Sequence, residues 1–176
     1  PSRAKSLASR LRSTRSSCPG ASHASMGREM DATQLRFGLF LPQIAQRFEQ
    51  VLEKTRIAEA AGFDALWLMD HLWTPGATQA DCLEGWTLAT ALAARTERIR
   101  LGHMVLCNGF RHPALLAKMS ATLDHVSGGR LELGLGWGSV PDELAAFGIG
   151  DEPPAQRAAR LGESLGVLRL LWSGER

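Results

Sequence analysis

Four short runs of apolar residues recur along the chain, and a stretch with helical spacing follows each of them. The runs cover residues 37–41, 65–69, 99–106 and 131–136, so their starts are 28, 34 and 32 positions apart. Continuous apolar strands that alternate with amphipathic helices are typical of a parallel sheet covered by helices. The regular spacing indicates repeated βα units. The pattern therefore predicts an α/β fold.

The stretches between the runs carry the periodicity of helices. Phe48, Val51, Leu52 and Thr55 recur at three- and four-residue intervals, and Gly62 ends this stretch, because glycine readily adopts the left-handed conformation found after a helix. We expect further helices over residues 83–94, 113–126 and 142–147, and a last helix around residues 161–171.

Two architectures accommodate four βα units: an open doubly wound sheet, or one half of a (β/α)8 barrel. A complete TIM barrel needs about 250 residues, whereas the part of the chain from residue 35 to residue 176 has 142. If the units belong to a barrel, the chain carries its first four βα units and is a half-barrel fragment. The pattern and the length leave both architectures open.

The first 34 residues differ from the rest in composition. They are rich in Ser, Arg and Ala and contain almost no large apolar side chains. Such a segment cannot bury enough surface to offset the entropy lost on ordering. We therefore expect residues 1–34 to be a disordered, basic leader outside the fold, and residues 35–176 to form the folded domain. A transit peptide has this composition, and an over-extended start ahead of Met26 or Met30 is the other interpretation.

The formal net charge of +2 is unevenly distributed. Residues 1–30 hold six of the 20 basic residues and one of the 18 acidic residues, which leaves 14 basic and 17 acidic residues in the remainder. A slightly acidic domain gives no general reason to expect nucleic acid or an anionic membrane as partner. The three cysteines are far apart and show neither a disulfide framework nor a metal-binding pair, which is typical of a reducing compartment. We expect a cytoplasmic protein without a metal site.

Residues that follow the apolar runs are the candidates for chemistry, because ligands of parallel α/β folds bind at the carboxyl ends of the strands. Asp70 and His71 follow the second run. An imidazole there can exchange protons near neutral pH, and a neighbouring carboxylate can fix its tautomer; a histidine that only caps a loop is the alternative. Gly136 and Trp137 follow the fourth run, where glycine permits close approach of a ligand and an indole can stack on a flat one.

Six short sequence motifs follow one another along the chain. They are FGLFLP at 37–42, AEAAGFDALW at 58–67, DHLW at 70–73, AARTERIRLG at 93–102, RHPALLAK at 111–118 and DHVSGGRLELGLG at 124–136. In this combination the chain resembles the bacterial luciferase-like monooxygenases over residues 36–176, and the leader has no match. The resemblance implies a (β/α)8 barrel that uses FMN or the deazaflavin coenzyme F420, of which this chain is the amino-terminal half.

The resemblance also implies roles for individual residues. In the most similar deazaflavin-dependent oxidoreductases, the histidine of the DHLW motif lies at the cofactor as an acid/base or hydrogen-bonding group, which makes His71 the catalytic candidate, with Asp70 beside it. The family has a non-prolyl cis peptide bond in its third strand that supports the cofactor ring, and the alignment places this bond at Met104–Val105. The further residues expected beside the ring are Cys107, Asn108, Gly136 and Trp137.

The resemblance implies an oxidoreductase or monooxygenase that transfers hydride to or from the cofactor or oxygenates a small organic substrate. Trp137 stands where deazaflavin-dependent sugar-phosphate dehydrogenases of this family carry a glutamate, which argues against a sugar-phosphate substrate. The family's later strands have no counterpart in these 176 residues. A non-catalytic half-barrel that cannot hold the cofactor alone is therefore the alternative. We expect a small-molecule substrate and allow for a homodimer of the full-length protein, with neither nucleic acid nor membrane as partner.

Overall fold

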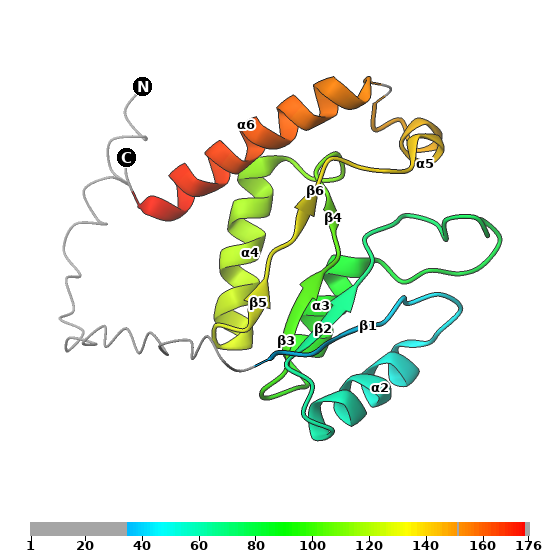
Figure 1. Cartoon of the computed structure of the whole chain (residues 1–176), viewed down its shortest axis with the longest axis vertical. Helices are drawn as coiled ribbons and strands as arrows, with labels where there is room; N and C mark the ends of the chain where they lie inside the picture. Colours follow the sequence, from blue (N-terminus) through cyan, green and yellow to red (C-terminus); the bar gives the residue numbers. More distant parts are fainter. Residues whose placement is uncertain (1–34, 151, 175–176) are drawn as a thin grey trace, which may run out of the picture. The chain divides into compact units, whose positions relative to one another are not determined.

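The computed structural model describes residues 35–150 and 152–174 (Figure 1). The expectation of a disordered leader over residues 1–34 lies outside these residues. None of the described helices combines the length and the hydropathy that crossing a membrane requires. The elements are β1 (Gly38–Phe40), α2 (Phe48–Ala60), β2 (Ala65–Leu68), α3 (Gly85–Ala93), β3 (Arg100–His103), β4 (Leu106–Cys107), α4 (Pro113–Ser127), β5 (Leu131–Glu132), β6 (Leu135–Gly136), α5 (Pro141–Ala146) and α6 (Pro154–Ser173).

The strands pair in parallel and in the order of the sequence. β1, β2, β3 and β5 form a four-stranded sheet, in which Leu66 of β2 pairs with Leu39 on one side and Leu101 on the other. β4 and β6 form a second, two-stranded parallel sheet. A doubly wound sheet reverses its strand order at a switch point, and the described strands show no reversal. The predicted α/β class with a parallel sheet is confirmed, and the described strands follow one another in sequential order.

The third and fourth apolar runs each form two short strands where the sequence predicts one. β3 ends at His103 and β4 begins at Leu106, and the two residues between them are joined by the cis peptide bond Met104–Val105. The cis bond lies at the position that the family resemblance implies. A two-residue gap also separates β5 from β6. A Cβ at Gly134 in this gap would lie 2.6 Å from the carbonyl oxygen of His103, so glycine lets the two interruptions pack against each other.

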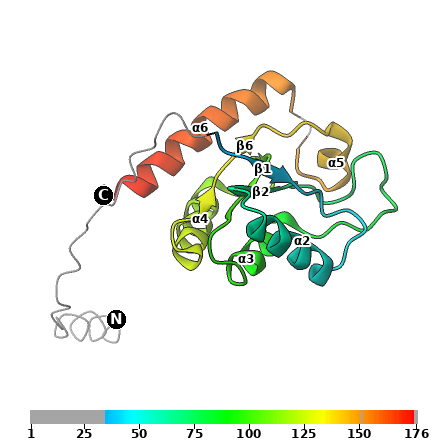
Figure 2. The same cartoon turned by 60° about the horizontal axis from the view of Figure 1, so that its bottom comes forward.

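Helices α2, α3 and α4 lie on one face of the four-stranded sheet (Figure 2). Leu66, Leu68 and Leu101 belong to the core on this face and are at most 1% exposed. Burying a leucine side chain contributes roughly 1.5–3 kcal/mol, so these strands are held mainly through this face. Phe40 of β1, in contrast, is 42% exposed. A Cβ at Gly102 would lie 2.6 Å from the ring of Trp67, so the neighbouring strand needs glycine there to accommodate the indole.

Two charged side chains join helices to strands at the amino ends of the strands. The carboxylate of Glu59 in α2 accepts hydrogen bonds of 2.6–3.0 Å from the backbone N–H groups of residues 97–99, just before β3. Burial raises the pKa of Glu59, but these hydrogen bonds outweigh it and lower the pKa overall. Arg130, just before β5, donates to the carbonyl oxygens of Ala93 and Thr96 at the end of α3. These two side chains form the amino-end network of the sheet.

Candidate active site

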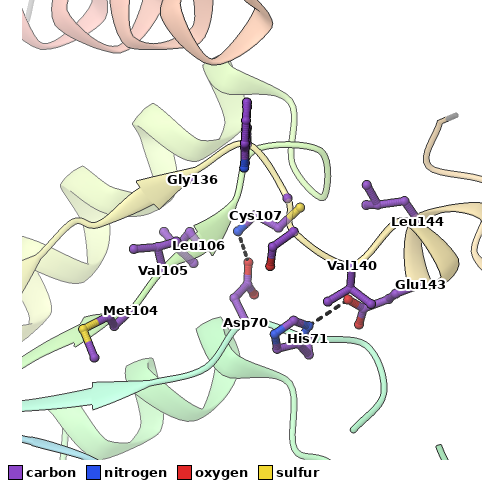
Figure 3. Close-up of a pocket in the computed structure, with 13 residues that line it drawn as sticks. Asp70, His71, Met104, Val105, Leu106, Cys107, Gly136, Val140, Glu143 and Leu144 are labelled. Atoms are coloured by element: carbon purple, nitrogen blue, oxygen red, sulfur yellow. Dashed lines mark hydrogen bonds and ion pairs between the residues drawn. The ribbon is translucent and has the colours of Figure 1, made fainter. Parts of the chain in front are cut away.

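The carboxyl ends of the strands and helix α5 surround a hollow of about 260 Å³ (Figure 3). In a parallel sheet these ends meet at one edge, so residues far apart in the sequence come together there. Seven of the eight residues predicted at the site line this hollow: Asp70, His71, Met104, Val105, Cys107, Gly136 and Trp137.

Asn108, the eighth predicted residue, lies elsewhere. It is 7% exposed and lines two neighbouring hollows that include Gly109 and Arg160. Its backbone N–H donates to the carbonyl oxygen of Gly136 at 2.8 Å, which continues the pairing of β4 with β6. Successive side chains along a strand point to opposite faces. Cys107 and Asn108 therefore line different hollows.

The carboxylate of Asp70 is buried and is bound by protein groups on both oxygens. Arg111 donates to both oxygens at 2.8 Å, and the backbone N–H of Cys107 donates to Oδ2 at 2.8 Å. Arg111 also pairs with Glu84 at 2.7 Å, and its guanidinium lies 5.8 Å from the ring centroid of Trp86. Burial lowers the pKa of Arg111, but its hydrogen bonds with Asp70 outweigh it and raise the pKa overall. Asp70 thus joins the end of β2 to β4 directly and, through Arg111 and Glu84, to the start of α3.

His71 makes a contact that the sequence does not predict. Its Nδ1 atom lies 2.8 Å from Oε2 of Glu143 in α5 (Figure 3). The other oxygen of Glu143 accepts hydrogen bonds from the backbone N–H groups of Leu72 and Trp73, at 2.5 and 3.2 Å. The side chain of Glu143 is 2% exposed and that of His71 is 23% exposed. The imidazole therefore borders the hollow with a buried carboxylate bound to it.

Apolar side chains make up most of the remaining lining of the hollow. Met104 and Val105 are 54% and 48% exposed, although they lie between the strands β3 and β4. A Cβ at Gly136 would lie 2.6 Å from Cγ2 of Val105, so glycine permits the two chain segments to approach. Trp137 also lines the hollow and is 43% exposed. An apolar surface with one imidazole at its border fits a planar aromatic ligand.

The thiol of Cys107 contributes apolar surface to this lining. Burial raises the pKa of Cys107. Burial also raises the pKa of Cys82, in the loop between β2 and α3, to about 11. Thiolates are the nucleophilic form of cysteine, and a raised pKa keeps the thiol protonated near neutral pH. The raised pKa values therefore give neither Cys107 nor Cys82 a nucleophilic role.

Comparisons with known proteins place this site in a family context. The model of the luciferase-like monooxygenase family matches residues 26–176. An F420-dependent glucose-6-phosphate dehydrogenase of Mycolicibacterium fortuitum is 38% identical over 131 residues, which cover 72% of this chain and 38% of that protein. This chain spans about two fifths of the length of the curated relatives that it matches.

Two solved structures are similar to the described fold. An F420-dependent secondary alcohol dehydrogenase, in complex with an F420–acetone adduct, aligns with a TM-score of 0.73 and 26% identity, over 81% of this chain and 43% of that chain. The monooxygenase RslO1 from Streptomyces bottropensis aligns with a TM-score of 0.67 and 31% identity, over 80% of this chain and 44% of that chain. Since the family model covers most of the sequence and solved oxidoreductases share the fold, the chain belongs to the luciferase-like monooxygenase family.

Proposed function

We propose that residues 35–176 form the first four βα units of a (β/α)8 barrel and carry the part of its active site that contacts a redox cofactor, F420 or FMN. The sequential parallel order of the strands supports this architecture, because a barrel adds each strand beside the preceding one. The position of α2, α3 and α4 on a single face also supports it, since the helices of a barrel form an outer ring.

Met104 and Val105 are the residues that would support the cofactor ring, and Gly136 and Trp137 would border it on another side. Their exposed apolar surface in the hollow is the observation that supports this assignment. When bound, such a cofactor accepts or donates a hydride at its central ring. Asp70 acts here through Arg111 and β4, because both of its oxygens are already bound by protein groups.

His71 is the proposed proton partner of the reaction. Oxidation of an alcohol to a carbonyl removes one hydride and one proton from the substrate, and the hydroxyl proton needs an acceptor at the site. An imidazole provides such an acceptor near neutral pH, which is general base catalysis. The single observation that carries this proposal is the position of His71, whose side chain is 23% exposed and lines the same hollow as Met104 and Val105.

The proposed substrate is a small alcohol or ketone that carries no phosphate group. The solved secondary alcohol dehydrogenase, with its F420–acetone adduct, supports this substrate class. Several curated relatives are glucose-6-phosphate dehydrogenases, but Trp137 occupies the position at which the family's sugar-phosphate dehydrogenases carry a glutamate. An indole lacks the carboxylate of that residue, so the sugar-phosphate reaction is not the proposed one.

The test uses the whole protein expressed from its gene, reconstituted separately with F420 and with FMN. We expect stoichiometric binding of one cofactor by fluorescence titration, and its reduction by a small alcohol in an absorbance assay. His71→Ala should lower turnover by about 10²–10⁴-fold, far more than the loss of its contact with the buried carboxylate of Glu143 lowers the stability. His125→Ala, at an exposed position of α4, should leave turnover unchanged.

Failure of the whole protein to bind either cofactor would overturn the proposal. Cofactor binding with unchanged turnover in His71→Ala would retain the enzyme but remove His71 from its role. Reduction of the cofactor by glucose 6-phosphate and not by small alcohols would overturn the substrate assignment and the argument from Trp137.

A further inference from the structure

We propose that Glu143 is a positioning residue that fixes the tautomer of His71, so that the imidazole presents an unprotonated Nε2 for proton transfer. The proposal rests on the proposed function, because it specifies the protonation of the ring that the reaction uses. Glu143 acts through His71 and takes no part in the proton transfer itself. Its carboxylate is bound by three groups of the loop that follows β2.

The hydrogen bonds of Glu143 determine where the imidazole proton lies. Oε1 accepts the backbone N–H groups of Leu72 and Trp73, and Oε2 lies 2.8 Å from Nδ1 of His71. A carboxylate can only accept hydrogen bonds, so Nδ1 carries the proton and donates. A neutral imidazole has one protonated nitrogen, and its Nε2 is then an acceptor. Among the residues that the structure describes, no hydrogen bond reaches Nε2 of His71.

The carboxylate is held in place by contacts independent of His71. Two successive backbone N–H groups fix Oε1, which ties α5 to the loop after β2. The rings of Trp73 and Phe147, the residue after α5, meet edge to face with 5.7 Å between centroids. Leu144, next to Glu143 in the helix, is 4% exposed. Glu143 is therefore positioned before any ligand enters the hollow, and it can orient the imidazole in advance.

The same contact keeps a carboxylate beside the ring during proton transfer. When Nε2 takes the proton of a substrate hydroxyl, the imidazole becomes a cation with protons on both nitrogens. The positive charge then lies beside the buried carboxylate of Glu143. Asp70 is the neighbouring acid, but its charge is paired with Arg111. Glu143 is thus the carboxylate that acts directly on the imidazole, in the way that the acid of a catalytic triad orients its histidine.

The substitution Glu143→Gln gives a sharp test, because glutamine has one acceptor and one donor end. The N–H groups of Leu72 and Trp73 require the amide oxygen, so the NH₂ group faces Nδ1 of His71 and donates to it. The imidazole proton then moves to Nε2. Two-bond ¹H–¹⁵N NMR spectra of histidine-labelled whole protein, without cofactor or substrate, should show His71 protonated on Nδ1 in the wild type and on Nε2 in Glu143→Gln.

The matched control is Asp142→Asn, which removes the neighbouring carboxylate from an exposed position of α5. It should leave the tautomer and the turnover unchanged. Glu143→Gln should lower kcat by about 10²-fold or more and leave the Kd for the cofactor within about twofold. His71→Asn identifies the resonances by their loss, and the melting temperature verifies that each variant is folded.

A wild-type ring protonated on Nε2 overturns the proposal, and this measurement does not depend on the folding of any variant. A reversed tautomer in Glu143→Gln with unchanged kcat also overturns it, because the tautomer would then have no role in the reaction. A protein with the expected tautomers in both forms but no activity with either cofactor overturns the proposed function instead. The two failures are therefore distinguishable.

Discussion

Replacing Arg111 with alanine tests the ion pair that joins Asp70, after β2, to the segment between β4 and α4. The side chains of Asp70 and Arg111 are 2% and 11% exposed, and two hydrogen bonds of 2.8 Å connect them. Without Arg111, the buried carboxylate keeps only the hydrogen bond from the N–H group of Cys107. Removing one partner of a buried ion pair costs about 3–5 kcal/mol.

Two further contacts of Arg111 add less to this cost. Its cation–π contact with the buried Trp86, 5.8 Å from the ring centroid, is worth about 0.5–2 kcal/mol. Its pair with Glu84, whose side chain is 41% exposed, adds less than about 1 kcal/mol. We therefore expect Arg111→Ala to lower the free energy of unfolding by about 4 kcal/mol.

Urea unfolding followed by tryptophan fluorescence measures this loss. With a slope of about 2 kcal/mol per molar urea, the midpoint should fall by about 2 M. Arg111→Lys keeps the charge but loses the planar fork that binds both oxygens, so we expect an intermediate loss. The control is Arg160→Ala, which breaks an exposed pair with Glu152 and should cost less than about 1 kcal/mol. Equal losses in Arg111→Ala and Arg160→Ala would refute the reasoning.

Three further predictions concern packing and titration. Gly102→Ala should lower the free energy of unfolding by about 1–3 kcal/mol, because its Cβ would lie 2.6 Å from the carbonyl oxygen of Glu132. At Gly162 a Cβ would meet nothing within 4 Å, so Gly162→Ala should raise the free energy of unfolding by up to about 1 kcal/mol. Similar effects of the two substitutions in urea unfolding would contradict this prediction. Burial lowers the pKa of His103 in the folded protein from its ordinary 6.5. Below pH 6.5 the unfolded chain therefore binds more protons at this residue than the folded protein does. The free energy of unfolding should fall as the pH drops from 6.5 towards the folded-state pKa. His103→Phe should reduce this dependence in unfolding measurements above and below pH 6.5, and an unchanged dependence would contradict it. The pKa of Cys82 is about 11, against an ordinary 9.0, so the reactive thiolate is scarce at neutral pH. Alkylation of Cys82, followed by peptide mass spectrometry, should be about a hundredfold slower than that of free cysteine. An equal rate would contradict this prediction.

The course of the fold could be predicted because burial dictates a readable pattern. The helix predicted to begin at Phe48 and to end before Gly62 corresponds to α2, Phe48–Ala60, whose buried positions recur at helical spacing. Hydropathy could not predict the division of the run at 99–106 into β3 and β4, because the interruption depends on backbone conformation and close packing at Gly134. The cis bond there followed only from the family resemblance.

The residues of the candidate site could likewise be predicted only in part from the sequence. The rule that strand ends meet at one edge brought His71 and Trp137 to one hollow. Glu143 escaped prediction because it is 72 positions from His71 and lies in a six-residue helix. Its neighbour Asp142 carries the same charge but is exposed, and no local pattern separates the two. Only the path of the chain determines which carboxylate becomes buried against the imidazole.

The amino-end network of Glu59 and Arg130 has a consequence for how such proteins diversify. Much of its bonding goes to backbone groups, at the ends of the strands remote from the hollow. Mutations that alter the chemistry at one end therefore leave the anchoring of the other end intact. A fold anchored in this way can accept substitutions around the hollow that change its substrate. Laboratory selection for new activities should therefore vary the loops around His71 and leave Glu59 and Arg130 unchanged.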